Sequence, residues 1–189
     1  DNVKLLHQFS DMLFINSSQF SPDGTQLVIV GHGGASLWKV KDEDIICLYQ
    51  SADPRMMKSC QFSPDGTQLV VAGYGATNLW EIKDDNVKLL HKFAEKRAIE
   101  SCQFSPDGTQ LVLAGHGGAS LWEITSDNVK LLHKFAKNIK VFNIAQNAVN
   151  GLIVITSFDR IYIYSLKNTE IIEVATLQSF NDSYIHYKD

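Results

Sequence analysis

One short sequence occurs three times in this chain at a fixed interval, and this repeat constrains the fold more than any other feature. The run Phe-Ser-Pro-Asp-Gly-Thr-Gln-Leu-Val occupies residues 20–28, 62–70 and 104–112. The tryptophans keep the same interval of 42 residues, at Trp38, Trp80 and Trp122. A period of this size is typical of proteins that stack one small structural unit many times. Such proteins present extended surfaces, so the repeat favours a binding protein over an enzyme.

Within one repeat, the pattern predicts four short antiparallel strands, at residues 58–62, 68–72, 78–82 and 86–93. Polar and apolar residues alternate in the first and third of these segments, as in half-buried strands. Ser-Pro-Asp-Gly-Thr is a turn sequence, because proline presets φ and glycine accepts the left-handed conformation. The last segment also has helical spacing. The β-branched residues in the equivalent segments 44–49 and 170–174 favour a strand there.

The repeat divides the chain into about four and a half copies of one unit. We expect a lone fourth strand at residues 1–9, three clear repeats at 10–51, 52–93 and 94–135, and a degenerate repeat at 136–178. Tyr164 replaces the tryptophan in the degenerate repeat, and residues 179–189 form a tail or begin a further strand. Each sheet is apolar on both faces, so neighbouring sheets are expected to pack face to face around the tryptophans. The predicted fold is therefore a single all-β domain.

Composition excludes several classes of protein. A net charge of −4 argues against a general nucleic-acid binder. No apolar run approaches the roughly 18 residues that span a membrane, and no signal peptide is visible. The cysteines are expected to be small buried thiols in a reducing compartment, because Cys60 and Cys102 share a repeat position and are not placed to bridge. These features predict a cytoplasmic protein without nucleic-acid or membrane partners.

The motifs resemble those of the WD-repeat (WD40) β-propeller family. The resemblance rests on Phe-Ser-Pro-Asp-Gly-Thr-Gln-Leu-Val, a small-residue turn, and then Leu-Trp-Glu/Lys-Ile/Val, and it covers essentially the whole chain. It implies four-stranded blades arranged radially about a central channel. The chain departs from the family pattern after each tryptophan, where Lys39, Glu81 or Glu123 replaces aspartate. The Gly-His pairs at residues 31–32 and 115–116 also lie in the turn between the second and third strands, not in the connector that opens each repeat.

Four blades would make a very tight ring. The resemblance therefore implies either a part of a longer chain or several copies that complete one ring.

Divergence between the repeats is concentrated at one rim of the expected sheets. In a meander, the turn between strands two and three and the connector from strand four to strand one share a rim. Ser-Pro-Asp-Gly-Thr is identical in three repeats, whereas the four-to-one connectors share almost nothing. Local divergence between duplicated repeats indicates separate contacts for each repeat, and neutral drift in loops is the alternative explanation.

Basic and methionine side chains at that rim suit an adaptable protein-binding surface. The predicted partner-binding residues are Met12, Phe14, Arg55, Met56, Met57, Lys58, Lys96, Arg97, Lys137 and Lys140, with His32, Tyr74 and His116 in the adjoining turns.

No catalytic or metal-binding set is visible in the sequence. His32 and His116 share a repeat position, but Tyr74 and Phe158 interrupt the series and no cysteine or carboxylate accompanies it. Gly-His-Gly-Gly lacks the following helix that a phosphate-binding loop needs. No nucleophile, base and orienting residue occur together.

We therefore expect no catalytic residues, no metal and no cofactor. The predicted function is a non-enzymatic interaction scaffold for a protein or peptide, for instance an acidic segment. Two alternatives stay open. One is a self-assembling propeller in which two or more chains complete a ring, and the other is a carbohydrate-binding propeller with one site in each repeat.

Overall fold

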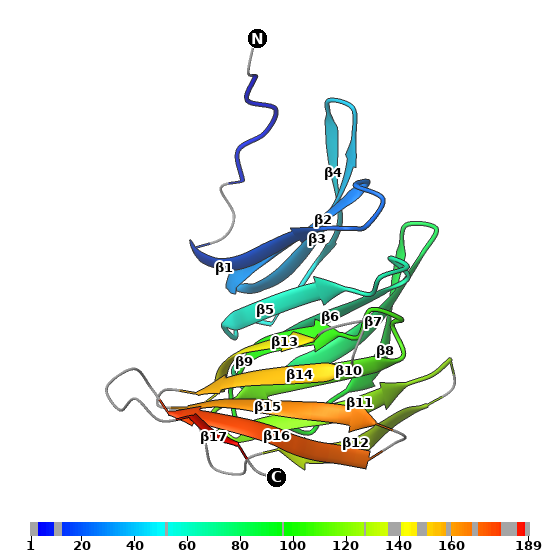
Figure 1. Ribbon diagram of the computed structural model, residues 1–189. Coiled ribbons are helices and arrows are strands. Elements are labelled where there is room, and N and C mark those ends of the chain that lie inside the picture. Colours follow the sequence, from blue (N-terminus) through cyan, green and yellow to red (C-terminus); the bar gives the residue numbers. More distant parts are fainter. Residues whose placement is uncertain are drawn as a thin grey trace. The chain divides into compact units, whose positions relative to one another are not determined.

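Antiparallel β-sheets make up the whole of the regular structure that can be described. The computed structural model describes residues 4–9, 13–51, 53–95, 97–126, 128–135, 141–146, 151–157, 160–167, 170–178 and 185–187. Every regular element in these ranges is a strand, in four sheets with antiparallel neighbours (Figure 1). The predicted all-β class with four-stranded antiparallel sheets is thus confirmed. The chain divides into two compact units, an N-terminal half (Asp1–Glu95) and a C-terminal half (Lys96–Asp189).

The N-terminal half contains two sheets, each formed by four consecutive strands in chain order. Sheet 1 consists of β1 (Leu13–Phe20), β2 (Gln26–His32), β3 (Gly34–Lys41) and β4 (Asp44–Gln50). Sheet 2 consists of β5 (Met57–Phe62), β6 (Gln68–Gly73), β7 (Thr77–Lys83) and β8 (Asn86–Lys92). The segment that also had helical spacing, now β8, is a strand.

The core of the N-terminal half lies between the two sheets. Sheet 1 contributes Val28, Val30 and Leu37, which lie on one face because their neighbours alternate across the pleat. Sheet 2 contributes Phe62 and Leu69, which are cross-strand partners in β5 and β6. Because β5 packs on β1 and β2, the inner strands of the two sheets bury their apolar residues together.

Trp80 fills the outer part of the interface between sheets 1 and 2. Its ring lies 5.1 Å from that of Tyr49 in β4 and packs against the buried core cluster. The expected position of the tryptophans between neighbouring sheets is therefore found at Trp80. In sheet 1, Trp38 carries the same local bond as Trp122 in the C-terminal half, because each indole Nε1 donates to the serine two residues earlier, at 2.8 and 2.9 Å respectively.

Residues 4–9 do not form the fourth strand expected for a preceding repeat, since none of them takes part in a sheet. They pack on sheet 1 by side chains instead. The Phe9 ring lies 5.0 Å from that of Trp38, and the His7 ring lies 5.9 Å from it. Lys4 and Glu43 add an exposed ion pair at 2.7 Å.

The C-terminal half contains the other two sheets. Sheet 3 consists of β9 (Ile99–Phe104), β10 (Gln110–Gly115), β11 (Gly118–Ile124) and β12 (Val129–Phe135). Sheet 4 consists of β13 (Val141–Gln146), β14 (Leu152–Ser157), β15 (Arg160–Lys167), β16 (Glu170–Gln178) and β17 (Ile185–Tyr187). Val112 and Leu121 of sheet 3 pack with Ile153 and Ile155 of sheet 4 in one core. Tyr164 takes the tryptophan position and lies 4.7 Å from the Phe135 ring.

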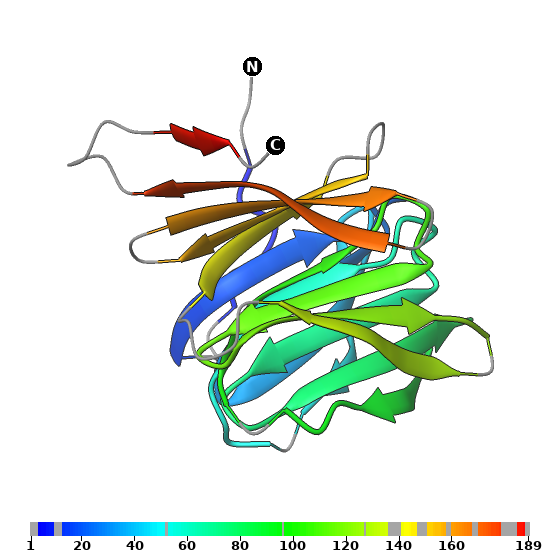
Figure 2. The same ribbon diagram turned by 60° about the horizontal axis from the view of Figure 1, so that its bottom comes forward.

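Two further features differ from the sequence-based expectations. The segment expected to begin a further repeat forms β17, which pairs with β16 as a fifth strand at the edge of sheet 4 (Figure 2). Cys47 is exposed, whereas Cys60 and Cys102 are buried free thiols. Cys47 lies in the outer strand β4, where fewer neighbours cover the sheet. Burial raises the pKa of the Cys60 thiol to about 11 and keeps it protonated and unreactive.

Candidate functional site

The Ser-Pro-Asp-Gly-Thr turns, which we call the constant turns (residues 21–25, 63–67 and 105–109), are locked by their own side chains. In sheet 2, the Ser63 hydroxyl donates to Asp65 Oδ1 at 2.6 Å and accepts from the Gln68 amide at 2.9 Å. The Thr67 amide donates to Asp65 Oδ1 at 3.1 Å. The equivalent bonds in sheets 1 and 3 agree with these within 0.1 Å. This network explains the identical sequence at the constant turns without any partner.

The constant-turn aspartates stay ionised under neutral conditions. The Ser21 hydroxyl, with the Thr25 amide, holds the pKa of Asp23 below its usual value, and Ser105 does the same for Asp107. Partial burial works in the opposite direction on the pKa of Asp65, but the bonds from Ser63 and Thr67 outweigh it and the pKa is again lowered. A hydrogen bond accepted by a carboxylate favours its charged form.

At the opposite end of each sheet lies what we call its variable rim, formed by the turn after the second strand (β2, β6 or β10) and the connector that enters the first strand (β1, β5 or β9). Backbone bonds join turn and connector in sheets 2 and 3. The Tyr74 amide donates to the Met56 carbonyl at 3.0 Å, and the His116 amide donates to the Ala98 carbonyl at 2.9 Å. The turns and connectors therefore share a rim, as the meander predicts.

A glycine at the end of the second strand permits this close approach. A Cβ added to Gly73 would lie 2.3 Å from the Met56 carbonyl oxygen, and one added to Gly115 would lie 2.0 Å from that of Ala98. A Cβ added to Gly31 would lie 2.5 Å from the Phe14 carbonyl oxygen. The small-residue turn seen in the sequence is thus explained by the connector that crosses over it.

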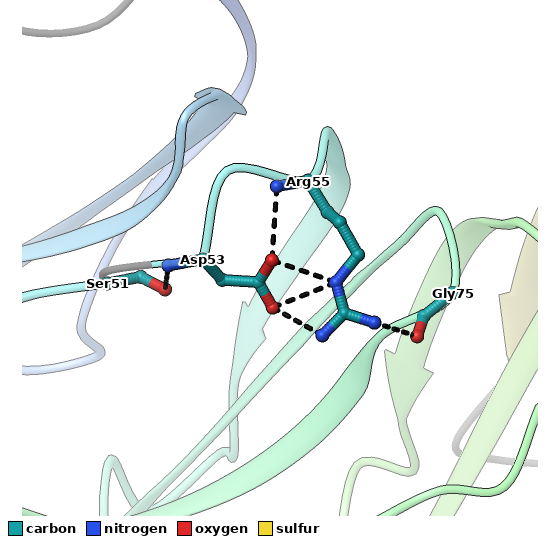
Figure 3. A network of polar contacts seen from close by, with 4 residues as sticks. All are labelled: Ser51, Asp53, Arg55 and Gly75. Carbon is teal, nitrogen blue, oxygen red and sulfur yellow. Dashed lines mark hydrogen bonds and ion pairs between the residues drawn. The ribbon is translucent and has the colours of Figure 1, made fainter.

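Arg55 clamps the connector of sheet 2 to the adjoining turn (Figure 3). Its Nε donates to Asp53 Oδ1 at 2.8 Å, and its Nη2 pairs with Asp53 Oδ2 at 2.5 Å. Its Nη1 donates to the Gly75 carbonyl on the other side of the rim. The ion pair raises the pKa of Arg55 and lowers that of Asp53. The charge of Arg55 is therefore largely balanced inside the protein.

Arg97 has the equivalent position in sheet 3 and a similar role. Its Nη1 donates to the His116 carbonyl at 3.2 Å, across the same connector and turn. The connectors of sheets 2 and 3 therefore share an arginine clamp, whereas Leu13 occupies the equivalent position in sheet 1. The spacing of Arg55 and Arg97, equal to that of the tryptophans, is the sequence signal for this clamp.

Each rim also carries a contact that belongs to its own repeat. In sheet 2, the Lys58 ammonium lies 5.6 Å from the centre of the Tyr74 ring. In sheet 3, the same two positions hold Glu100 and His116, whose Oε1 and Nε2 atoms are 2.8 Å apart. Lys58 and Glu100 occupy the β-bulge of the first strand. Glu100 is the rim residue that the sequence analysis missed.

Phe14 is the most unusual residue of the rim in sheet 1. It has a positive φ of 53° and its side chain is 78% exposed. The edge of its ring meets His32, with 5.7 Å between the ring centres. A bulky residue in the left-handed region costs on the order of 1–3 kcal/mol and is concentrated at functional sites. The backbone of sheet 1 therefore holds an aromatic ring in solvent at the rim.

The remaining predicted residues divide into three groups. Met56 is partly buried beside the rim. Met57 is only 2% exposed and belongs to the core between sheets 1 and 2, which removes it from the predicted contact surface. The β-bulge at Lys58 places the side chain of Met57 on the same face as those of Cys60 and Phe62. Four predicted residues lie outside the described part of the chain: Met12, Lys96, Lys137 and Lys140.

Comparison with known proteins adds no family assignment, because neither a scan against protein-family models nor a search of curated proteins gives a match. In the described ranges, no cluster of three or more His, Cys, Asp or Glu side chains is arranged to hold a metal ion. The same ranges contain no helix with the length and apolarity needed to cross a membrane.

Proposed function

We propose that this protein is a non-enzymatic interaction scaffold of the β-propeller type, which binds a protein or peptide segment on the variable rim. The radial arrangement of the sheets as blades rests on the resemblance to WD repeats. It is supported by the four-stranded meanders and by the packing of sheet 1 on sheet 2. The rim, rather than a pocket, is the proposed contact surface.

The observation that carries this proposal is the exposed ring of Phe14, which is held by a strained backbone with positive φ. An aromatic side chain that is already ordered loses little conformational entropy on binding, and aromatic residues are enriched among interface hot spots. Tyr74 supplies a second exposed ring in sheet 2 of the same half. The constant turns supply no comparable apolar group, because their polar side chains bond to one another.

The contacts at the rim favour a partner with an apolar anchor over one that is mainly acidic. Asp53 already balances Arg55, so a carboxylate from a partner would compete with an internal ion pair. Lys58 stays within reach of a single acidic side chain beside Tyr74. The proposed ligand is therefore an apolar side chain against Phe14 and Tyr74, flanked by one carboxylate. The unlike pairs in sheets 2 and 3 give no support to one carbohydrate site in each repeat.

Peptides selected from a displayed random library test the proposal. We expect peptides selected on the wild-type chain to bind the Phe14→Ser and Tyr74→Ser variants at least about tenfold more weakly, since a truncated hot spot costs 2 kcal/mol or more. Ile46→Ser is the matched control, because Ile46 is an exposed apolar residue of β4 away from the rim. Equal affinity for Phe14→Ser and Ile46→Ser, or failure to select any peptide, would contradict the proposal.

A further inference from the structure

The same repeat position is buried in sheet 2 and exposed in sheet 1. Phe62 is 4% exposed, whereas its equivalent Phe20 is 55% exposed. Met57 is 2% exposed, whereas its equivalent Ile15 is 52% exposed. All four residues belong to first strands of the N-terminal half. The equivalent positions are therefore apolar in both sheets, and only the burial of their side chains differs.

Sheet 1 itself provides the covering in the case of Phe62. The face of sheet 1 with Val28, Val30 and Leu37 packs on the face of sheet 2 with Phe62 and Leu69. Cross-sheet polar contacts fix the register, because Gln19 Oε1 accepts from the Phe62 amide at 2.8 Å. The opposite face of sheet 1, which we call the open face, carries Phe20, Ile15 and Trp38.

Part of the open face is covered by the N-terminal segment. His7 lies on Trp38 as its repeat equivalent Tyr49 lies on Trp80, with ring distances of 5.9 and 5.1 Å. Residues 4–9 thus take the place of the outer strand of a covering sheet. The part of the open face beside β1 stays uncovered. The equivalent part of sheet 2, beside β5, is covered by the inner strands of sheet 1.

Sheet 4 carries the complementary face. In β6 and β10, all residues after the first are buried, so both faces of these strands are covered. In β14, buried and partly buried residues alternate, so one face is less covered. That face carries Val154 and Ile163, the repeat equivalents of Val28 and Leu37. It therefore resembles the surface that buries Phe62.

We propose that sheet 4 of a second copy of this chain packs on the open face of sheet 1 and buries Phe20 and Ile15. The template for the contact is the packing of sheet 1 on sheet 2. Such a head-to-tail contact joins unlike surfaces, so it either closes into a ring of copies or continues as a chain of copies. Sheet 4 of the second copy suits the open face, because it belongs to the same repeat and has the same alternation of apolar residues as sheet 1.

Particle mass measured by light scattering after size-exclusion chromatography tests the proposal. The wild-type chain is expected to form particles of at least twice the 21.1 kDa mass of one copy. Phe20→Glu places a carboxylate in the contact and is expected to weaken association by at least about 30-fold, which gives single copies at micromolar concentration. Ile46→Glu is the control, since Ile46 is also 55% exposed but pairs with Lys39 rather than lying beside Trp38.

Mixing two variants separates loss of contact from loss of fold. Phe20→Glu damages the open face, and Val154→Glu damages the complementary face, so each variant retains one intact surface. Each alone is expected to be a single copy with the circular dichroism of a strand-rich protein, and an equimolar mixture is expected to form pairs. A wild-type mass of one copy, an unchanged mass for Phe20→Glu, or a mixture without pairs would overturn the proposal. A wild-type mass of one copy would mean that the open face is exposed to solvent or is covered by residues of the same chain.

Discussion

The smallest feature that determines the structure is the serine of the constant turn. Its hydroxyl donates to the aspartate two residues later and accepts from an amide five residues later, so it joins both strands that the turn connects. Proline and glycine give the turn its backbone angles, but the buried hydroxyl satisfies an amide at the start of the second strand. Ser63 is buried, and its bond cannot be replaced easily by water.

Removing the Ser63 hydroxyl should therefore destabilise sheet 2. Ser63→Ala leaves the Gln68 amide without its partner, and we expect a loss of about 1–3 kcal/mol in the free energy of unfolding. Thr67→Val, which removes an exposed bond to the same aspartate, should cost less than about 1 kcal/mol. Urea unfolding followed by tryptophan fluorescence measures both. Equal transition midpoints for the two variants would show that burial of the hydroxyl has no influence.

The constant-turn aspartates should make stability fall in acid. The pKa values of these aspartates in the folded protein lie below the ordinary aspartate value of 3.8, so their contribution to stability is complete above that pH. It is lost as pH falls through the lowered values, because protonation then removes the charged acceptor. Denaturant midpoints between pH 7 and pH 2 should show this decline. The Asp65→Asn, Asp107→Asn double variant should be less stable at pH 7 and lose less below pH 4, and parallel curves would argue against this origin.

At the scale of strands and turns, local sequence patterns predicted the features that depend on residues close together in the chain. Alternation and turn residues predicted the four strands of sheet 2, because both signals lie within a few residues of the element they specify. The rim contacts depend on residues that are distant in sequence, such as Arg55 and Gly75. No local pattern reports them, and only comparison of repeats could have revealed the clamp.

Errors in the predicted site have the same physical origin. Met57 was expected at the surface because the connector was taken to end after it, whereas β5 begins there and the β-bulge at Lys58 puts Met57 on the buried face. A shift of one residue reverses the face to which a side chain belongs. Glu100 was missed because the bulge that aims it at His116 arises from the pairing register.

The glycines of the variable rim provide a test at this scale. Gly115→Ala would place a Cβ against the Ala98 carbonyl, and we expect a loss of at least about 1–3 kcal/mol, as for other overpacked sites. Gly117→Ala is a close control, because its Cβ would meet only the flexible Arg97 side chain at 3.4 Å, and its effect should stay within about 0.5 kcal/mol. Thermal unfolding compares the pair. A similar melting temperature for both variants would mean that the connector moves away without cost.

At the scale of the molecule, one strand carries two proposed surfaces. Phe14 lies at the variable rim, and Phe20 lies at the other end of β1 on the open face. Six residues separate them, which is about 20 Å along a strand. The two aromatic anchors, Phe14 for binding on the rim and Phe20 for packing of copies, therefore lie at different ends of the same element, although Ile15 of the open face is next to Phe14 in the chain.

The two surfaces should consequently respond to substitution independently. Phe14→Ser is expected to lose affinity for selected peptides while its particle mass equals that of the wild type. Phe20→Glu is expected to give single copies that bind the same peptides with unchanged affinity. Sites about 20 Å apart without shared partners are additive within about 0.5 kcal/mol, so the double variant should show both losses and no more. Loss of peptide binding in Phe20→Glu would instead mean that the binding surface is completed by a second copy, and the rim of one chain would then be insufficient.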